Sequence, residues 1–273
     1  MGWLHRDVQK ELEGVEAAIE TGDLERAARK AGRVVSKWPE NAAGWSLAGE
    51  IAWSLGELEE AENALRRGLA LDARDWRSRD ALAQVRLEQG ALSEARALAE
   101  EAALAAPGDP DVLWTLAMTL ELNDEGAAAK KAYAQAHRLS PELHYLPFRV
   151  TREDFDALTQ DAIQQLPDRI RDALQNVELS VKDFPGQEDT AAGDPPLSPL
   201  LLGVFLGNSL AQQSIHDPWS TALPARILIF QSNIERASPT REELIHQIRV
   251  TVFHEVGHYL GLNEEEIHGR GLG

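Results

Sequence analysis

Apolar residues recur with a helical period through the first half of the chain, and this pattern repeats every 34 residues. Three sets of residues keep the spacing: Gly22, Gly56 and Gly90 with Asp124; Ala27, Ala61, Ala95 and Ala129; and Pro39, Pro107 and Pro141, with Ala73 in the second place. Gly or Asp makes the tight turn between two helices, Ala lets the helices approach, and Pro ends the second helix. The pattern predicts four helix pairs over 8–41, 42–75, 76–109 and 110–143.

The second half of the chain has a different pattern. Residues 177–184 alternate apolar and polar side chains, which indicates a half-buried strand. The other expected elements are helices over 151–165 and 167–175, strands over 200–206 and 226–231, and a long helix that starts near 240. Gly-, Pro- and Asp-rich or polar segments, 185–199 and 208–224, separate the strands. We expect a small α+β domain over 147–273, with helices on a short mixed or antiparallel sheet.

The long final helix carries the clearest candidate chemistry. Its start has the form of a capping box, Thr240 to Glu243. Further along, His254 and His258 are four residues apart and therefore project from one face. Two imidazoles at this spacing can hold one tetrahedral Zn²⁺ and leave positions open. Glu255 follows the first histidine, where a carboxylate can take a proton from an activated water. The motif predicts a zinc site with Glu255 as general base.

A third ligand can come from the segment after this helix. Gly261 is an expected helix stop, and Glu264 is the tenth residue after His254. The longer metallopeptidase pattern HExxHxxGxxH has its third ligand at that offset, and a carboxylate is an acceptable ligand. Glu264 is therefore the expected third ligand, with Glu265 and His268 as alternatives. The other interpretation is that Glu264, Glu265 and Glu266 form a solvated acidic cap on a short C-terminal helix.

The 34-residue unit, with its Gly, Ala and Pro positions, resembles the tetratricopeptide repeat. The resemblance implies an all-α superhelix over 1–146 whose concave groove binds a peptide or protein partner. By position the groove should contain Ser46, Glu50, Asp80, Gln84, Trp114 and Met118. Since this set has no basic side chain to hold an acidic peptide, a neutral or basic ligand is favoured. The alternative is that the repeats only act as a scaffold or dimerise.

The region from about Arg149 to Gly273 resembles the minimal zincin-like metallopeptidase family of bacteria. The segments that carry the resemblance are 151–167, 200–207, 223–230, 252–255 and 261–268. The family pattern usually has Asp where this chain has Glu264, commonly after another Asp where it has Asn263. The resemblance implies a zincin-like fold, zinc as the metal, and a peptide or protein as the substrate.

Composition excludes several other classes. The chain has 27 Lys and Arg against 45 Asp and Glu, a net charge of −18, which disfavours nucleic-acid partners and anionic membranes. Cysteine is absent, so neither disulfides nor thiolate ligands are available. The longest apolar run, from Leu200 to Leu206, is too short to cross a bilayer, and the first residues lack a signal-peptide pattern. These features predict a cytoplasmic protein.

Two hypotheses remain from the sequence. The first is a zinc-dependent peptidase, with His254, His258 and Glu264 as metal ligands, Glu255 as general base, and repeats that recruit a protein. The second is a catalytically silent zincin-like scaffold that acts through its repeat groove. The substituted third ligand and the repeat array motivate the second hypothesis.

Overall fold

A computed structural model describes residues 2–193, 196–210 and 225–269, the first five of them for their main chain only. The chain divides into two compact units, Met1–His144 and Tyr145–Gly273. Most of the polar segment expected over 208–224 lies outside the described residues. Within the described part of the chain, none of the helices combines the length and apolar character that a membrane span requires.

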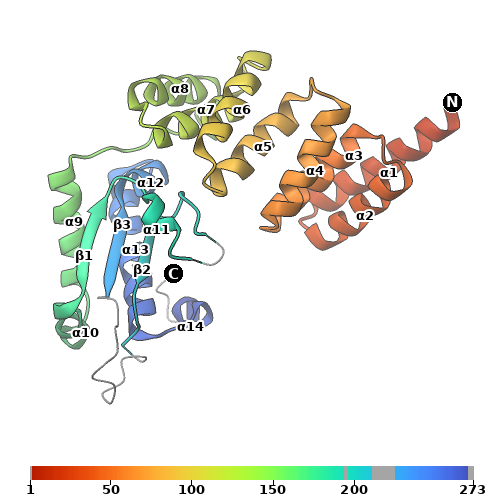
Figure 1. Cartoon of the computed structure of the whole chain (residues 1–273). Coiled ribbons are helices and arrows are strands. Elements are labelled where there is room, and N and C mark those ends of the chain that lie inside the picture. Colours follow the sequence, from red (N-terminus) through yellow and green to blue (C-terminus); the bar gives the residue numbers. More distant parts are fainter. Residues whose placement is uncertain (1, 194–195, 211–224, 270–273) are drawn as a thin grey trace. The chain divides into compact units, whose positions relative to one another are not determined.

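The first unit is a chain of antiparallel helix pairs, in red to yellow-green in Figure 1. Its helices are α1 (Gly2–Glu20), α2 (Leu24–Lys37), α3 (Ala42–Ser54), α4 (Leu58–Leu71), α5 (Trp76–Glu88), α6 (Leu92–Ala105), α7 (Pro110–Leu122) and α8 (Gly126–Leu139). The first helices of the later pairs start alike: Asn41, Asp75 and Asp109 each accept main-chain N–H groups of the helix that follows. These caps keep the 34-residue period too, and they fix where each pair begins.

The turn inside each pair needs a left-handed residue. Gly22, Gly56 and Gly90 have φ of 73°, 79° and 77°. Asp124 takes the same place with φ of 63°, and among the described residues it is the only non-glycine with positive φ. Asp tolerates this conformation better than most L-residues do. The repeating Gly and Asp positions are therefore required by backbone geometry.

Close helix packing explains the repeating small residues. Ala27, Ala61, Ala95 and Ala129 are at most 1% exposed. Helices α3 and α4 approach closely, since a Cβ added to Gly49 would be 2.5 Å from Cγ of Leu65. Leu65 itself is completely buried. Small residues at these points therefore set the separation of the two helices.

The second unit has a three-stranded sheet and six α-helices in its described part. In chain order the elements are α9 (Arg152–Gln164), α10 (Asp168–Ala173), a 3₁₀ turn (Leu174–Asn176), β1 (Glu178–Lys182), α11 (Gln187–Thr190), β2 (Gly203–Leu206), β3 (Arg226–Phe230), α12 (Gln231–Arg236), α13 (Arg241–Leu260) and α14 (Glu264–Gly269). Helix α12 follows β3 without a break, and the sequence pattern did not indicate it. The strand expected from 200 begins only at Gly203.

The sheet is mixed, with strand order β1–β3–β2. β1 is parallel to β3, with Glu178 opposite Arg226, and β2 is antiparallel to β3, with Gly203 opposite Ile229. Strand β3 is therefore central, and β2 forms an edge (Figure 1). An edge strand keeps unpaired main-chain groups that another chain can use.

The core of the second unit joins β3 to two helices. Ile227 and Ile229 of β3 pack with Phe155 of α9 and with Ile248 and Val252 of α13, and all five are at most 1% exposed. This packing buries one face of α13, so that the histidine face of the helix is directed elsewhere. Two buried charged residues, Glu235 and Arg236 of α12, are hydrogen-bonded within the same unit.

We expect Gly49→Ala to destabilise the first unit by about 1–3 kcal/mol, because the new methyl group overlaps Leu65. The matched control is Gly32→Ala at an exposed position of α2, where an added Cβ meets nothing within 4 Å. This control should stabilise the unit by about 0.5–1 kcal/mol. Six of the seven tryptophans lie in residues 1–144, so urea unfolding followed by tryptophan fluorescence reports mainly on this unit. Equal midpoints for the two variants would contradict the packing argument.

Candidate functional site

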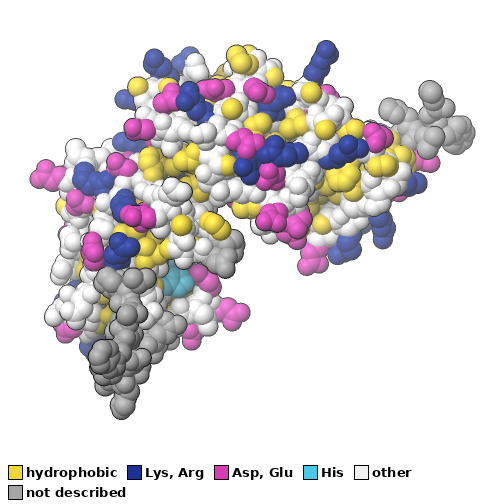
Figure 2. All heavy atoms as spheres, viewed as in Figure 1, with side chains coloured by type: hydrophobic (Ala, Val, Ile, Leu, Met, Phe, Trp, Pro, Cys, Tyr) yellow, Lys and Arg dark blue, Asp and Glu magenta, His cyan; other side chains and the backbone are white. Residues whose placement is uncertain are grey.

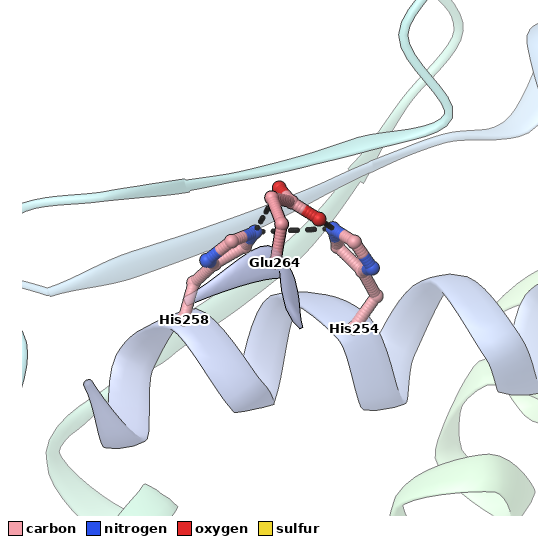
Figure 3. Close-up of side chains that lie close together, drawn as sticks. All are labelled: His254, His258 and Glu264. Atoms are coloured by element: carbon pink, nitrogen blue, oxygen red, sulfur yellow. Dashed lines mark hydrogen bonds and ion pairs between the residues drawn. The ribbon is translucent and has the colours of Figure 1, made fainter. Parts of the chain in front are cut away.

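Helix α13 presents both motif histidines on one face. Thr240 caps the helix, since its hydroxyl accepts the N–H of Glu243, and Gly261 ends it with φ of 90°. The buried positions of α13, such as Val252 and Val256, face the core. His254 and His258 lie one turn apart on a partly exposed side of the helix (Figure 3). Figure 2 shows histidine side chains (cyan) at the surface of this unit, next to acidic side chains (magenta).

The three residues expected as metal ligands lie together. Nε2 of His254 and Nε2 of His258 are 3.0 Å apart. Oε1 of Glu264 is 3.2 Å from Nε2 of His258, and Oε2 of Glu264 is 3.6 Å from Nε2 of His254. The side chains point toward one another in Figure 3. In the described part of the chain, this is the only group of three or more potential metal ligands.

These separations fit one small metal ion. Two ligands of a tetrahedral zinc at 2.0–2.1 Å are ~3.3 Å apart, by the geometry of such sites. The observed separations of 3.0, 3.2 and 3.6 Å bracket that value. Burial lowers the pKa of His254, although the charge of Glu264 opposes this effect. A lowered pKa favours the neutral imidazole, which is the form that binds a metal. The donor set therefore suits zinc.

The position of Glu264 depends on how the chain turns back after α13. Asn263 caps α14 through its side chain, which accepts the N–H of Glu266 at 2.9 Å, while Glu266 accepts the N–H of Asn263 at 3.0 Å. Ile267 is completely buried. A Cβ added to Gly257 would be 2.9 Å from Cγ1 of Ile267. The absence of a side chain at Gly257 therefore lets α14 dock on α13.

The same turn separates Glu264 from the two alternatives. Glu265 and His268 are not in the cluster. Nδ1 of His268 is 2.8 Å from the main-chain oxygen of Glu264 and 4.0 Å from its Oε2. Glu264 also lies in the first turn of α14. The same residue therefore belongs to the expected acidic cap and is the expected third metal ligand.

Glu255 is a buried carboxyl group beside this cluster. It is 6% exposed. Burial raises the pKa of Glu255 to about 7, with a smaller contribution from the charge of Glu264, while a main-chain hydrogen bond from Phe205 opposes the shift. A carboxyl group with a pKa near neutrality can both accept and return a proton.

Strand β2 forms the wall opposite α13. A Cβ on Gly203 would be 2.7 Å from Cγ2 of Thr251 and 3.0 Å from Cγ of Glu255. Gly203 therefore permits the close approach of helix and strand, and a glycine within a short apolar run is the sequence signal for such an approach. Sequence reasoning did not single out Gly203 or Phe205. A cavity of about 610 Å³ lies here, lined by β2, His254, Glu255, His258 and Glu264.

Comparison with known families agrees with both units. Residues 174–272 match the family model described as zincin-like metallopeptidase. Residues 12–75 and 52–110 match a tetratricopeptide repeat model. The chain consists of tetratricopeptide repeats followed by a zincin-like domain. A search of curated proteins finds no match.

Several solved structures are similar to this chain. A crystal structure of MamA protein is 17% identical, covers 53% of this chain and 79% of its own, and has a TM-score of 0.44. YrrB, described as a TPR protein with an unusual peptide-binding site, is 16% identical over 50% of this chain and 70% of its own, with a TM-score of 0.43. Pseudomonas aeruginosa pilF is 19% identical over 50% and 63%, with a TM-score of 0.46. These identities are too low to inform the function.

The repeat unit has a cavity of its own, of about 540 Å³, formed by helices α3, α5 and α7 and by His144. Four of the six expected groove residues line it: Glu50, Asp80, Gln84 and Trp114. The other two do not. Ser46 is buried, where it bonds to Ser78 and Asp75, and Met118 packs beside the core of α7 and α8.

Asp80 is the most unusual residue of this cavity. It is 6% exposed, and its Oδ2 accepts a hydrogen bond from Nε2 of Gln84 at 2.9 Å. Its Oδ1 has no hydrogen-bond partner, and the hydroxyl of the neighbouring Thr115 donates to the main-chain oxygen of Asp111. Burial raises the pKa of Asp80 from 3.8 to about 6, against smaller lowering effects of Thr115 and Gln84.

This shift makes the stability of the repeat unit depend on pH. The folded state holds the proton of Asp80 up to about pH 6, whereas the unfolded state releases it near 3.8. Stability is therefore lost as the pH rises from about 4 to 6, and the loss reaches about 3 kcal/mol above that window. We expect Asp80→Asn to remove this loss, so that its advantage over the native protein grows between pH 4 and 7.

Urea unfolding at pH 4, 5, 6 and 7, followed by tryptophan fluorescence, measures this difference. The control is Glu59→Gln at an exposed position of α4, whose stability should equal that of the native protein at every pH. A constant difference between Asp80→Asn and the native protein would show that Asp80 does not titrate in this window.

Proposed function

We propose that this chain is a zinc-dependent peptidase whose repeats bind a protein. The observation that carries the proposal is the convergence of His254, His258 and Glu264 on one point, with the buried carboxyl group of Glu255 in the same cavity. The match to zincin-like metallopeptidases supports it. Phosphoryl transfer and thiol chemistry have no comparable support, because the chain has no P-loop motif and no cysteine.

Each residue has a distinct task in this reaction. His254, His258 and Glu264 would hold the zinc ion. Zinc bound there would supply Lewis acidity, which would lower the pKa of a water toward about 7 and polarise a carbonyl group. Glu255 takes the proton of the attacking water and returns it to the leaving amine. The raised pKa of Glu255 suits both transfers. Tyr259 takes no part, because its hydroxyl donates to the main-chain oxygen of Ala173.

Strand β2 is the proposed support for an extended substrate. Leu202 accepts the N–H of Phe230, and Val204 lies opposite Leu228 two residues further along. In an antiparallel ladder the residues between such pairs turn their main-chain groups outward. Gly203 and Phe205 therefore face the outer edge, where Glu255 occupies the N–H of Phe205. The other outward groups of these two residues remain for a peptide that adds to the sheet.

A second candidate is a catalytically silent scaffold that acts through its repeats. The cavity of the repeat unit favours this candidate. Its described lining residues all belong to the first unit, and none of them is an expected metal ligand. In that case zinc, if bound, would only stabilise the fold of the second unit.

We expect Glu255→Gln to lower the hydrolysis of a mixed peptide library about 10²–10⁴-fold, since the amide cannot act as a base. The variant should retain about one zinc per chain, measured by elemental analysis after dialysis, because Glu255 is not a ligand. His254→Ala should lose both the metal and the activity. A Glu255→Gln protein as active as the native chain would refute the mechanism. If the native chain neither binds zinc nor hydrolyses peptides, the scaffold function is supported instead.

We expect Gly257→Ala to weaken zinc binding about 10–100-fold, as is typical when the support of a ligand is disturbed. The added methyl group displaces Ile267 and with it α14, so that Glu264 moves away from the histidines. The control is Gly269→Ala at the end of α14, where an added Cβ meets nothing within 4 Å. Competition with a chromogenic chelator measures both affinities. If the two variants bind zinc equally well, docking of α14 does not determine the site.

A further inference from the structure

Acidic and aromatic side chains share the cavity of the repeat unit. Its walls include the indoles of Trp53, Trp76 and Trp114 and the carboxylates of Glu50 and Asp80. All of its described lining residues belong to the first unit. Indole faces attract cations, and carboxylates bind them directly. The cavity therefore combines the two side-chain chemistries that recognise a positively charged group.

The acidic residues of the cavity differ in whether they have partners. Asp109 caps α7, and Oδ1 of Asp111 is 2.8 Å from Nε2 of His144. In contrast, Oδ1 of Asp80 has no hydrogen-bond partner among the described residues. Burial and the charge of Asp75 raise the pKa of Glu50. The cavity thus holds a buried carboxyl group with an unpartnered oxygen, Asp80, and a half-buried one, Glu50.

The rim of the cavity already shows a guanidinium against an indole. Cζ of Arg77 lies 4.6 Å from the ring centroid of Trp76. The positive charge of Arg77 lowers the pKa of Glu50, so Arg77 interacts electrostatically with a residue of the cavity. It nevertheless forms no ion pair with Glu50 or Asp80 within the described residues. A cation bound in the cavity would therefore compensate both carboxylates.

The geometry points to the cavity of α3, α5 and α7 as a binding site for an arginine side chain of an extended peptide segment, with Asp80 as its counter-ion and the indoles as its stacking surface. Arginine fits better than lysine, because its planar guanidinium donates hydrogen bonds at a fixed angle and stacks on aromatic rings. A volume of about 540 Å³ accommodates this side chain together with the neighbouring main chain. This inference concerns the repeat unit and does not depend on the proposed peptidase activity.

The test uses the whole 273-residue chain and four probes, with binding measured by isothermal titration calorimetry. The first probe is the blocked heptapeptide Ac-Gly-Ala-Ser-Arg-Ser-Ala-Gly-NH₂. The second replaces arginine by citrulline, which is nearly isosteric but neutral, and the third replaces it by lysine. The fourth is agmatine, a free guanidinium compound. The Glu255→Gln protein serves as the host, so that hydrolysis cannot interfere.

We expect the arginine peptide to bind with a Kd below about 1 mM and the citrulline peptide at least about tenfold more weakly, since the charge is lost. Lysine and agmatine should bind more weakly than the arginine peptide, because lysine lacks the planar fork and agmatine lacks the peptide. The affinity should fall as salt is raised. Equal binding of the arginine and citrulline peptides, or no binding of either, would overturn the inference. Agmatine that binds as tightly as the peptide would overturn the assignment to a peptide.

Variants locate the site. Asp80→Asn should weaken the arginine peptide about tenfold or more, as is typical when one partner of a buried charge pair is removed. The variant should remain folded, because it removes a buried uncompensated charge. Trp76→Leu should weaken binding of the same peptide, because a stacking surface is lost. The control is Glu59→Gln, at an exposed position of α4, which should bind the peptide as the native chain does. If Asp80→Asn and Trp76→Leu both bind like the native chain, the peptide occupies another surface and the inference is wrong.

Discussion

The docking of α14 on α13 is the contact on which the candidate metal centre depends. Two histidines one turn apart follow from the helix alone, but a third ligand must be returned to them by the chain. Gly261 reverses the chain with positive φ, and the bare backbone at Gly257 receives the buried side chain of Ile267. Glu264 reaches the histidines because these two glycines let the short helix lie against the long one.

Close approach of elements through small residues recurs across the whole chain. In the zincin-like domain, Gly203 lets the edge strand approach α13, so that Glu255 is enclosed and its pKa is raised by burial. In the repeats, Gly49 and the alanines of the 34-residue period bring paired helices together in the same way. A methyl group at Gly49, Gly203 or Gly257 would overlap a neighbouring side chain. The chain therefore uses missing side chains to position the chemically important ones.

Both units place a carboxyl group where burial opposes its charge. Glu255 lies beside three potential metal ligands, and Asp80 lies in a cavity with indole walls. The partners that we propose for them come from outside the chain: a metal-activated water for Glu255 and a cationic side chain for Asp80. The two sites belong to different units of the chain. Binding by the repeats and chemistry in the zincin-like domain can therefore be tested independently.

Local rules in the sequence determined the repeat architecture, the long capped helix and the shared face of His254 and His258, because these depend on residue spacing and backbone geometry. The order of the strands and the short helix α12 did not follow from spacing. Spacing favoured Glu264 as the third member of the cluster but did not exclude Glu265 or His268. These features depend on contacts between residues far apart or across a turn, such as Gly203 with Glu255 and Gly257 with Ile267. Tertiary packing decided them, because only the folded chain determines which side chains are buried and which main-chain groups stay free.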